Sequence, residues 1–163
     1  MAKDITKRLL FIVLLVLIQA LILNHIHLFN CATPMLYLLI PLQFSSDQTR
    51  WSALLWCFSI GLLIDIFSNT PGIAAASMTL IGLLQPYLLP LFISNDKDEV
   101  IRPSIKTLGW GMFLTYALVI ILVYCLLFFT LEAFSFFDTT QWALSVGAST
   151  LFTLILVTII VKL

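Results

Sequence analysis

The sequence predicts an all-α, polytopic membrane protein that forms one transmembrane domain over residues 1–163. Of its 163 residues, 61% are hydrophobic and 10% are charged, whereas soluble domains contain about 45–50% apolar and about 25% charged residues. Polar stretches divide the chain into six apolar segments and leave almost no room for a soluble domain. Composition and segmentation together exclude an ordinary soluble fold.

The six predicted spans cover residues 9–23, 32–44, 51–67, 73–93, 108–130 and 142–161. The last three are near or above the length of about 20 residues that a helix needs to cross a hydrocarbon core of about 30 Å. The first three are shorter, so we expect them to recruit flanking residues or to thin the bilayer locally. The first segment is not followed by the small residues of a signal-peptide cleavage site, which favours a permanent span.

The distribution of basic residues tests this count of spans. Eight Lys and Arg residues balance eight Asp and Glu residues, a balance that gives no sign of a nucleic-acid partner. With six spans and an inside amino terminus, all eight basic residues lie on the cytoplasmic side, as the positive-inside rule requires. If residues 32–44 did not span, three would lie inside and five outside. The sequence therefore predicts that both termini are cytoplasmic.

A turn over residues 68–72 separates the third and fourth spans, which we expect to form an antiparallel hairpin. Thr70 is predicted to cap the fourth helix, and Pro71 is predicted to take its first position, where a missing N–H costs nothing. Pro86 and Pro90 interrupt the fourth span. We expect kinks there, because each proline leaves a backbone carbonyl for a neighbour to satisfy.

Asp65 is the acidic residue placed furthest inside a span. An ionisable residue at the centre of a membrane helix costs roughly 2.5–3.5 kcal/mol, so such residues usually face a protein interior or a polar cavity. Two interpretations remain open. The carboxylate is either a structural anion at the positive amino-terminal end of the fourth helix or part of a ligand or partner site.

Small residues predict close helix packing in two places. Gly61 lies one turn before the acidic residue, and the fourth span begins with small side chains that include Ala75. The sixth span carries Ser145, Ser149 and Thr153 at intervals of four residues. Such residues let membrane helices approach closely, and they fit either packing within the chain or an interface with another subunit.

Neither a metal, nor a cofactor, nor catalysis is predicted. His25, His27 and Cys31 lie close together in the first outside loop, but a metal site normally uses three or four protein ligands and no other His or Cys lies in an outside loop. The chain lacks the nucleophile, zinc-protease and phosphate-loop motifs. An intramembrane aspartyl hydrolase needs two carboxylates at one site, and no second acidic residue lies inside a span.

The stretch from Gly61 to Ala76 resembles the most recognisable part of the rod-shape-determining membrane protein MreD family. In that family a G-x-x-x-D pattern ends one span, here Gly61 and Asp65, and a P-G pair opens the next, here Pro71 and Gly72. The chain length, the six predicted spans, the inside termini and the basic amino terminus are also similar. The first outside loop is most similar to that of members from the Bacteroidetes group.

This resemblance implies a non-catalytic scaffold of the elongasome in the bacterial cytoplasmic (inner) membrane, which supports cell shape and lateral peptidoglycan synthesis. The implied partners, besides the lipid bilayer, are an MreC-like bitopic protein bound through helices near Gly61–Ala76, an MreB-like filament, and the rod-type glycosyltransferase and transpeptidase. The implied fold is similar to the S components of energy-coupling-factor transporters.

The alternative is an S-type subunit of a transporter that binds a small molecule such as a vitamin. Such subunits typically carry an A-x-x-x-A-like motif on the first span, where this chain has Ala20 alone, and they use longer outside loops. A channel would need more polar lining than Gln19, Asp65 and Gln85 provide. The scaffold interpretation is therefore favoured.

Overall fold

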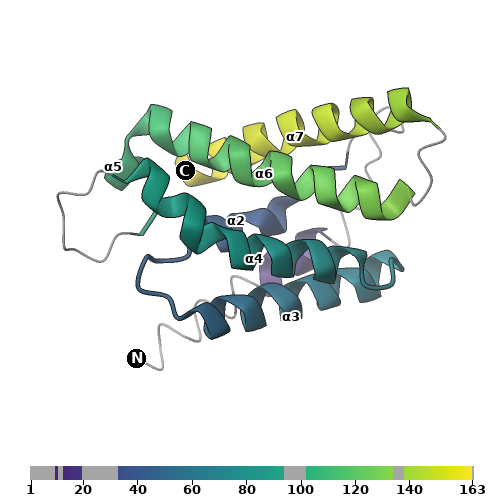
Figure 1. Cartoon of the computed structure of the whole chain (residues 1–163), viewed down its shortest axis with the longest axis horizontal. Helices are drawn as coiled ribbons and strands as arrows, with labels where there is room; N and C mark the ends of the chain where they lie inside the picture. The colour runs from purple at the N-terminus through teal and green to yellow at the C-terminus, as the bar shows by residue number, and fades with distance from the viewer. Residues whose placement is uncertain (1–9, 11–12, 20–32, 94–101, 134–137, 163) are drawn as a thin grey trace.

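All regular secondary structure is helical in the part of the chain that the computed structural model describes, residues 10, 13–19, 33–93, 102–133 and 138–162 (Figure 1). Four helices are long and apolar enough to cross a membrane: α3 (Arg50–Ser68), α4 (Ile73–Phe92), α6 (Trp110–Ala133) and α7 (Thr139–Lys162). The two longest have 24 residues, or about 36 Å at 1.5 Å per residue. Their bounds agree with the third to sixth predicted spans to within 3 residues. The helical class is thus confirmed for the described residues, and the four apolar helices indicate a membrane-embedded protein.

The first predicted span is described in part. Residues 13–19 are helical, and this helix buries Leu15, Val16 and Gln19 while it exposes Leu14 and Leu17. One face of the first segment therefore packs into the protein. The remainder of the span, apart from residue 10, lies outside the described residues.

The second predicted span is not a continuous helix. Residues 33–35 have no regular secondary structure, and only the single 3₁₀ turn η2 (Leu36–Leu38) and the short helix α2 (Leu39–Leu42) follow. These two elements rise by about 12 Å, which is less than the hydrocarbon core. Pro34 disfavours a helical conformation at the residue before it and donates no N–H, so the helix does not start until Leu36. We call residues 33–44 the central segment.

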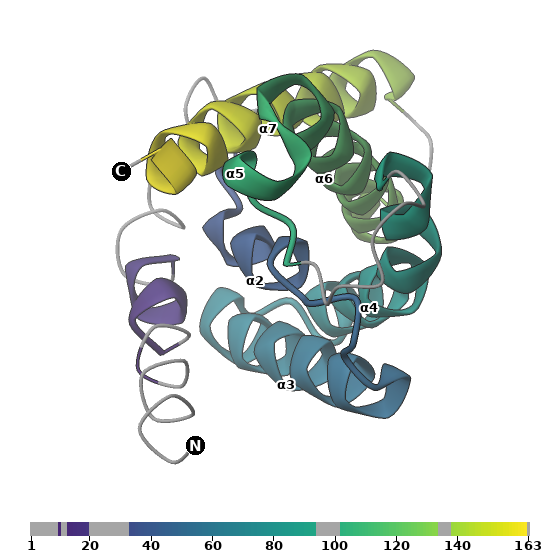
Figure 2. The same cartoon turned by 90° about the vertical axis from the view of Figure 1, so that its left-hand side faces the viewer.

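The central segment lies inside the bundle. Viewed along the long axis of the molecule, α2 lies between α3 and α4 on one side and α6 and α7 on the other (Figure 2). Every residue from 35 to 42 is buried. An irregular backbone is tolerated at membrane depth only where protein surrounds it, and this position provides that protection.

The hairpin between α3 and α4 closes one end of the molecule, as predicted from the turn over residues 68–72. The two helices make the most extensive contact between described elements and lie side by side in Figure 1. α4 runs without a break from Ile73 to Phe92, although Pro86 and Pro90 lie within it.

The opposite end of the molecule is basic. It carries the short helix α5 (Ile105–Leu108), which Ser104 and Thr107 cap by reciprocal hydrogen bonds. All described Lys and Arg residues lie there: Arg50, Arg102, Lys106 and Lys162. The Arg50 guanidinium lies 5.2 Å from the centroid of the Tyr87 ring, and the Lys162 ammonium lies 5.9 Å from that of Trp110. We call this the basic end.

Candidate functional site

Asp65 lies near the end of α3, and its carboxylate is buried against the start of α4. Its Oδ1 accepts hydrogen bonds from the Ala74 N–H and the Thr70 hydroxyl, and its Oδ2 accepts one from the Ala75 N–H, each at 2.9 Å. These two amides belong to the first turn of α4, where an N–H has no partner within the helix. The carboxylate thus acts as a cap supplied by the preceding helix, and this is the geometry that the helix-dipole interpretation predicts.

The turn differs from the prediction in which residue caps α4. The helix begins at Ile73 and not at Pro71, and its N-cap is Gly72 with φ of 82°, a left-handed conformation that glycine adopts without steric cost. The Thr70 hydroxyl donates to Asp65. The amides of Ala74 and Ala75 bond to the Asp65 carboxylate instead of to Thr70.

Gly61 brings the backbones of α3 and α4 into close contact. A Cβ atom added there would lie 2.5 Å from the Ala75 Cα and 2.7 Å from the Ala74 carbonyl oxygen, separations at which the backbone would have to move. The prediction that small residues pack these helices together is confirmed for Gly61 and Ala75. Gly61, Asp65 and Ala75 face the protein interior, whereas Pro71 and Gly72 of the predicted motif are exposed.

The small polar side chains of α7 bind the central segment. The Ser149 hydroxyl accepts a hydrogen bond from the Thr33 N–H at 3.1 Å, and the Thr153 hydroxyl accepts one from the Met35 N–H at 3.2 Å. Both side chains are fully buried, whereas Ser145 is only partly buried. This stripe therefore serves packing within the chain, where two of its members replace hydrogen bonds that a helix would have made.

Two buried glutamines hold the ends of the same segment. Gln19 Nε2 donates to the Pro34 carbonyl at 2.6 Å, and its Oε1 accepts from the Leu36 N–H at 3.0 Å. Gln85 Nε2 donates to the Phe44 carbonyl at 3.3 Å. The sequence marks both residues as polar groups inside spans, and the structure assigns them to the irregular backbone of the central segment.

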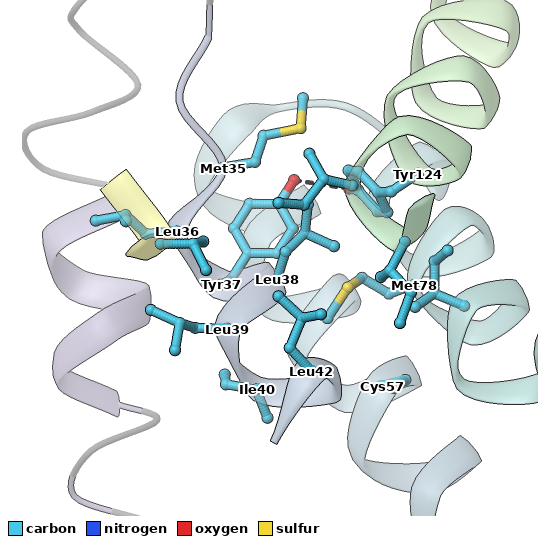
Figure 3. Packing of buried hydrophobic residues seen from close by; sticks show 14 of the residues in the cluster. Met35, Leu36, Tyr37, Leu38, Leu39, Ile40, Leu42, Cys57, Met78 and Tyr124 are labelled. Carbon is cyan, nitrogen blue, oxygen red and sulfur yellow. Dashed lines mark hydrogen bonds between the residues drawn. The ribbon is translucent and has the colours of Figure 1, made fainter. Parts of the chain in front are cut away.

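A pair of tyrosines, which the sequence analysis missed, fixes the middle of the central segment. The hydroxyls of Tyr37 and Tyr124 lie 2.6 Å apart, and their rings meet edge to face with centroids 5.7 Å apart. Figure 3 shows this contact among apolar side chains that include Leu38 and Met78. A buried tyrosine needs a partner for its hydroxyl, so a tyrosine in the middle of a span is the signal that could have found the pair.

No group of three or more potential metal ligands occurs among the described residues. His25, His27 and Cys31 lie outside them, so the structure says nothing of that cluster. Cys57 and Cys125 are free and buried in spans, where a thiol behaves as a small hydrophobic group. The buried polar groups named above hold helices and backbone together, and none of them adjoins a second carboxylate or a histidine in the described chain.

Comparison of the chain with protein-family models, with curated proteins and with solved structures finds no match.

Proposed function

We propose that this chain is a non-catalytic membrane scaffold of the MreD type, which binds a single-span, MreC-like partner in the bacterial inner membrane. The observation that carries the proposal is the use of its buried polar groups. Asp65 caps a helix, and Gln19, Ser149 and Thr153 bind backbone, so each performs a structural task within the chain. A protein built in this way offers its outer helix faces to other molecules.

The proposal includes six spans and two cytoplasmic termini. The basic end supports this orientation, because Lys and Arg concentrate on the cytoplasmic side of membrane proteins. In the described chain Arg50, Arg102, Lys106 and Lys162 all lie at that end. The proposed links to an MreB-like filament and to the peptidoglycan-synthesising enzymes rest on the resemblance over Gly61–Ala76.

The outward face of α3 is the proposed partner surface. Among the described elements α3 packs extensively on α4 alone, and it exposes a continuous row of large apolar side chains that includes Leu55, Leu62 and Ile66, at 65%, 40% and 67%. Lipid supplies no hydrophobic drive for helix association, so such a face binds a partner helix through shape complementarity. Leu62 and Ile66 belong to the Gly61–Ala76 stretch, so this face is the outer side of the predicted region.

Site-specific photocrosslinking tests the partner surface. A photoreactive amino acid at Leu62 should crosslink an MreC-like protein expressed in the same cells. The matched control is Leu151, which is exposed at 62% on α7 and should give lipid adducts only. Equal crosslinking from both positions, or from neither while the two proteins co-purify, would contradict the proposed face. Failure of the two proteins to co-purify would contradict the scaffold itself.

A vitamin-binding transporter subunit is the second candidate, and one observation favours it. A cavity of about 630 Å³ opens among Ser52, Trp56, Phe113 and other residues at the basic end, and ligand pockets commonly measure about 300–1,000 Å³. A thermal-shift screen decides between the candidates, because a ligand at about 100 times its Kd stabilises the folded state by about 2.7 kcal/mol. A shift with any vitamin would favour this candidate over the scaffold.

A further inference from the structure

The cavity at the basic end combines an apolar wall with a polar rim. The central segment, the first turns of α3 and α6, the last turn of α7 and the residues before α5 enclose it. Its apolar lining includes Trp56 and Val161, which are partly exposed, and behind them Leu39, Leu42 and Phe113, which are buried. Its rim carries Gln43, Gln48, Ser52, Arg102 and Ser104. Figure 2 looks onto this end of the molecule.

Arg102 is the only charged residue among the described residues that line the cavity. Its backbone is held in place, because the Thr107 hydroxyl donates to its carbonyl at 2.7 Å and the adjoining Pro103 is buried. Its side chain is exposed, and no described carboxylate lies within ion-pair distance of it. The rim thus carries an exposed cation on a backbone that is held in place.

The other polar groups of the rim, Gln43, Gln48, Ser52 and Ser104, are neutral, so among the described residues the Arg102 guanidinium is the anchor for an anionic ligand. Gln48 Nε2 donates to the Ser52 hydroxyl at 3.1 Å, and the Ser104 hydroxyl accepts from the Thr107 N–H at 3.3 Å. A guanidinium binds phosphate through two parallel N–H groups and tolerates partial removal from water better than an ammonium does. The anchor therefore selects a phosphate or a carboxylate.

The apolar wall narrows the choice of ligand. A free anion would leave the apolar side chains of the cavity without a partner, whereas a lipid can place its phosphate on Arg102 and an acyl chain beside the partly exposed Trp56 and Val161. Basic pockets between membrane helices are typical sites for anionic lipid headgroups. We propose that this cavity binds one anionic phospholipid, with its phosphate on Arg102 and one acyl chain beside Trp56 of α3 and Val161 of α7. This proposal does not rest on the scaffold function.

Quenching of Trp56 fluorescence tests the proposal, because Trp56 lies in the cavity wall. The full chain, with Trp51, Trp110 and Trp142 changed to Phe, is reconstituted in bilayers that contain brominated phosphatidylglycerol or brominated phosphatidylcholine. Half-maximal quenching should need a roughly fivefold lower mole fraction of the anionic lipid, since one basic residue near a membrane surface favours an anionic lipid by about that factor.

Two variants separate the cavity from general surface attraction. Arg102→Gln should abolish the preference for phosphatidylglycerol. Lys106→Gln removes an exposed cation at the same end that does not line the cavity, and it should leave the preference intact. Equal quenching by the two lipids, or an equal loss in the two variants, would overturn the proposal. Displacement of the anionic lipid by soluble glycerol phosphate would show a site for a free phosphate instead. Far-ultraviolet circular dichroism should be identical for the two variants, which shows that neither result is caused by misfolding.

Discussion

At the scale of single residues, Asp65 shows how an acidic side chain near the end of an apolar helix can be satisfied by hydrogen bonds within the chain. Its two oxygens accept three hydrogen bonds, two of them from amides at the positive end of α4. Each bond involves a charged acceptor and is stronger than a bond between neutral groups. The arrangement ties the end of α3 to the start of α4 and so fixes the hairpin.

Replacing this carboxylate by an amide should destabilise the protein. In Asp65→Asn one amide N–H of α4 faces the new NH₂ group and loses its acceptor, a loss that costs about 1–3 kcal/mol for a buried donor. Asp47→Asn is the matched control, because Asp47 is exposed and surface substitutions usually change stability by less than about 0.5 kcal/mol. Denaturation of both purified variants in mixed detergent micelles measures the difference. Equal stability of the two variants would contradict the capping role.

At the scale of elements, two devices build the bundle. The first is the direct backbone contact between α3 and α4 at Gly61. The second is the central segment, in which the amides of Thr33, Met35 and Leu36 donate hydrogen bonds to side chains of neighbouring helices. Both features depend on contacts between residues far apart in the sequence or on different helices. A substitution that adds an atom at Gly61 or removes one of these hydrogen-bond acceptors should therefore destabilise the fold.

A methyl group should be tolerated at one helical glycine and rejected at another. Gly61→Ala places a Cβ 2.5 Å from the Ala75 Cα, and such overpacking costs about 1–3 kcal/mol. Gly147→Ala in α7 meets no atom within 4 Å, so the better helix propensity of alanine should leave the protein unchanged or stabilise it by up to about 1 kcal/mol. Thermal unfolding in detergent compares the two. A Gly61→Ala protein as stable as Gly147→Ala would show that the helices separate freely.

Removal of one hydroxyl from α7 should loosen the central segment. Thr153→Val keeps the shape of the side chain but leaves the buried Met35 N–H without an acceptor, at a cost of about 1–3 kcal/mol. Thr158→Val is the control on the same helix, because that hydroxyl bonds only to carbonyls of α7 itself. Hydrogen exchange at the Met35 amide should accelerate in Thr153→Val alone. Unchanged exchange in both variants would show that this hydrogen bond does not hold the central segment in place.

At the scale of the whole molecule, charge separates the two ends. The described Lys and Arg residues all lie at the basic end, whereas Glu132 and Asp138 lie at the other. The positive-inside rule predicts that such a basic end is cytoplasmic. In that orientation Arg102 and its cavity would lie at a membrane–water interface, where anionic lipid is available.

Cysteine labelling should reveal this orientation. In a background with Cys31→Ser, a thiol at Asp138→Cys should react with a membrane-impermeant maleimide in intact spheroplasts, and a thiol at Asp47→Cys should react only after lysis. Both positions are exposed, and the remaining thiols of Cys57 and Cys125 are buried. The reverse pattern would place the basic end outside and contradict the positive-inside assignment.

The sequence alone determined the helical class and the bounds of the four long helices to within 3 residues, because apolar length is a local property of the chain. It left open whether Gly61 packs within the chain or against another subunit, and the structure places it against α4. Only the tertiary structure decided that residues 33–44 form an irregular central segment and that Gln19, Ser149 and Thr153 hold it. The partners of Ser149 and Thr153 are separated from them by 116 and 118 positions. A backbone N–H that has no partner in its own segment bonds to whichever acceptor the tertiary fold places beside it. Local sequence patterns do not show which acceptor that is.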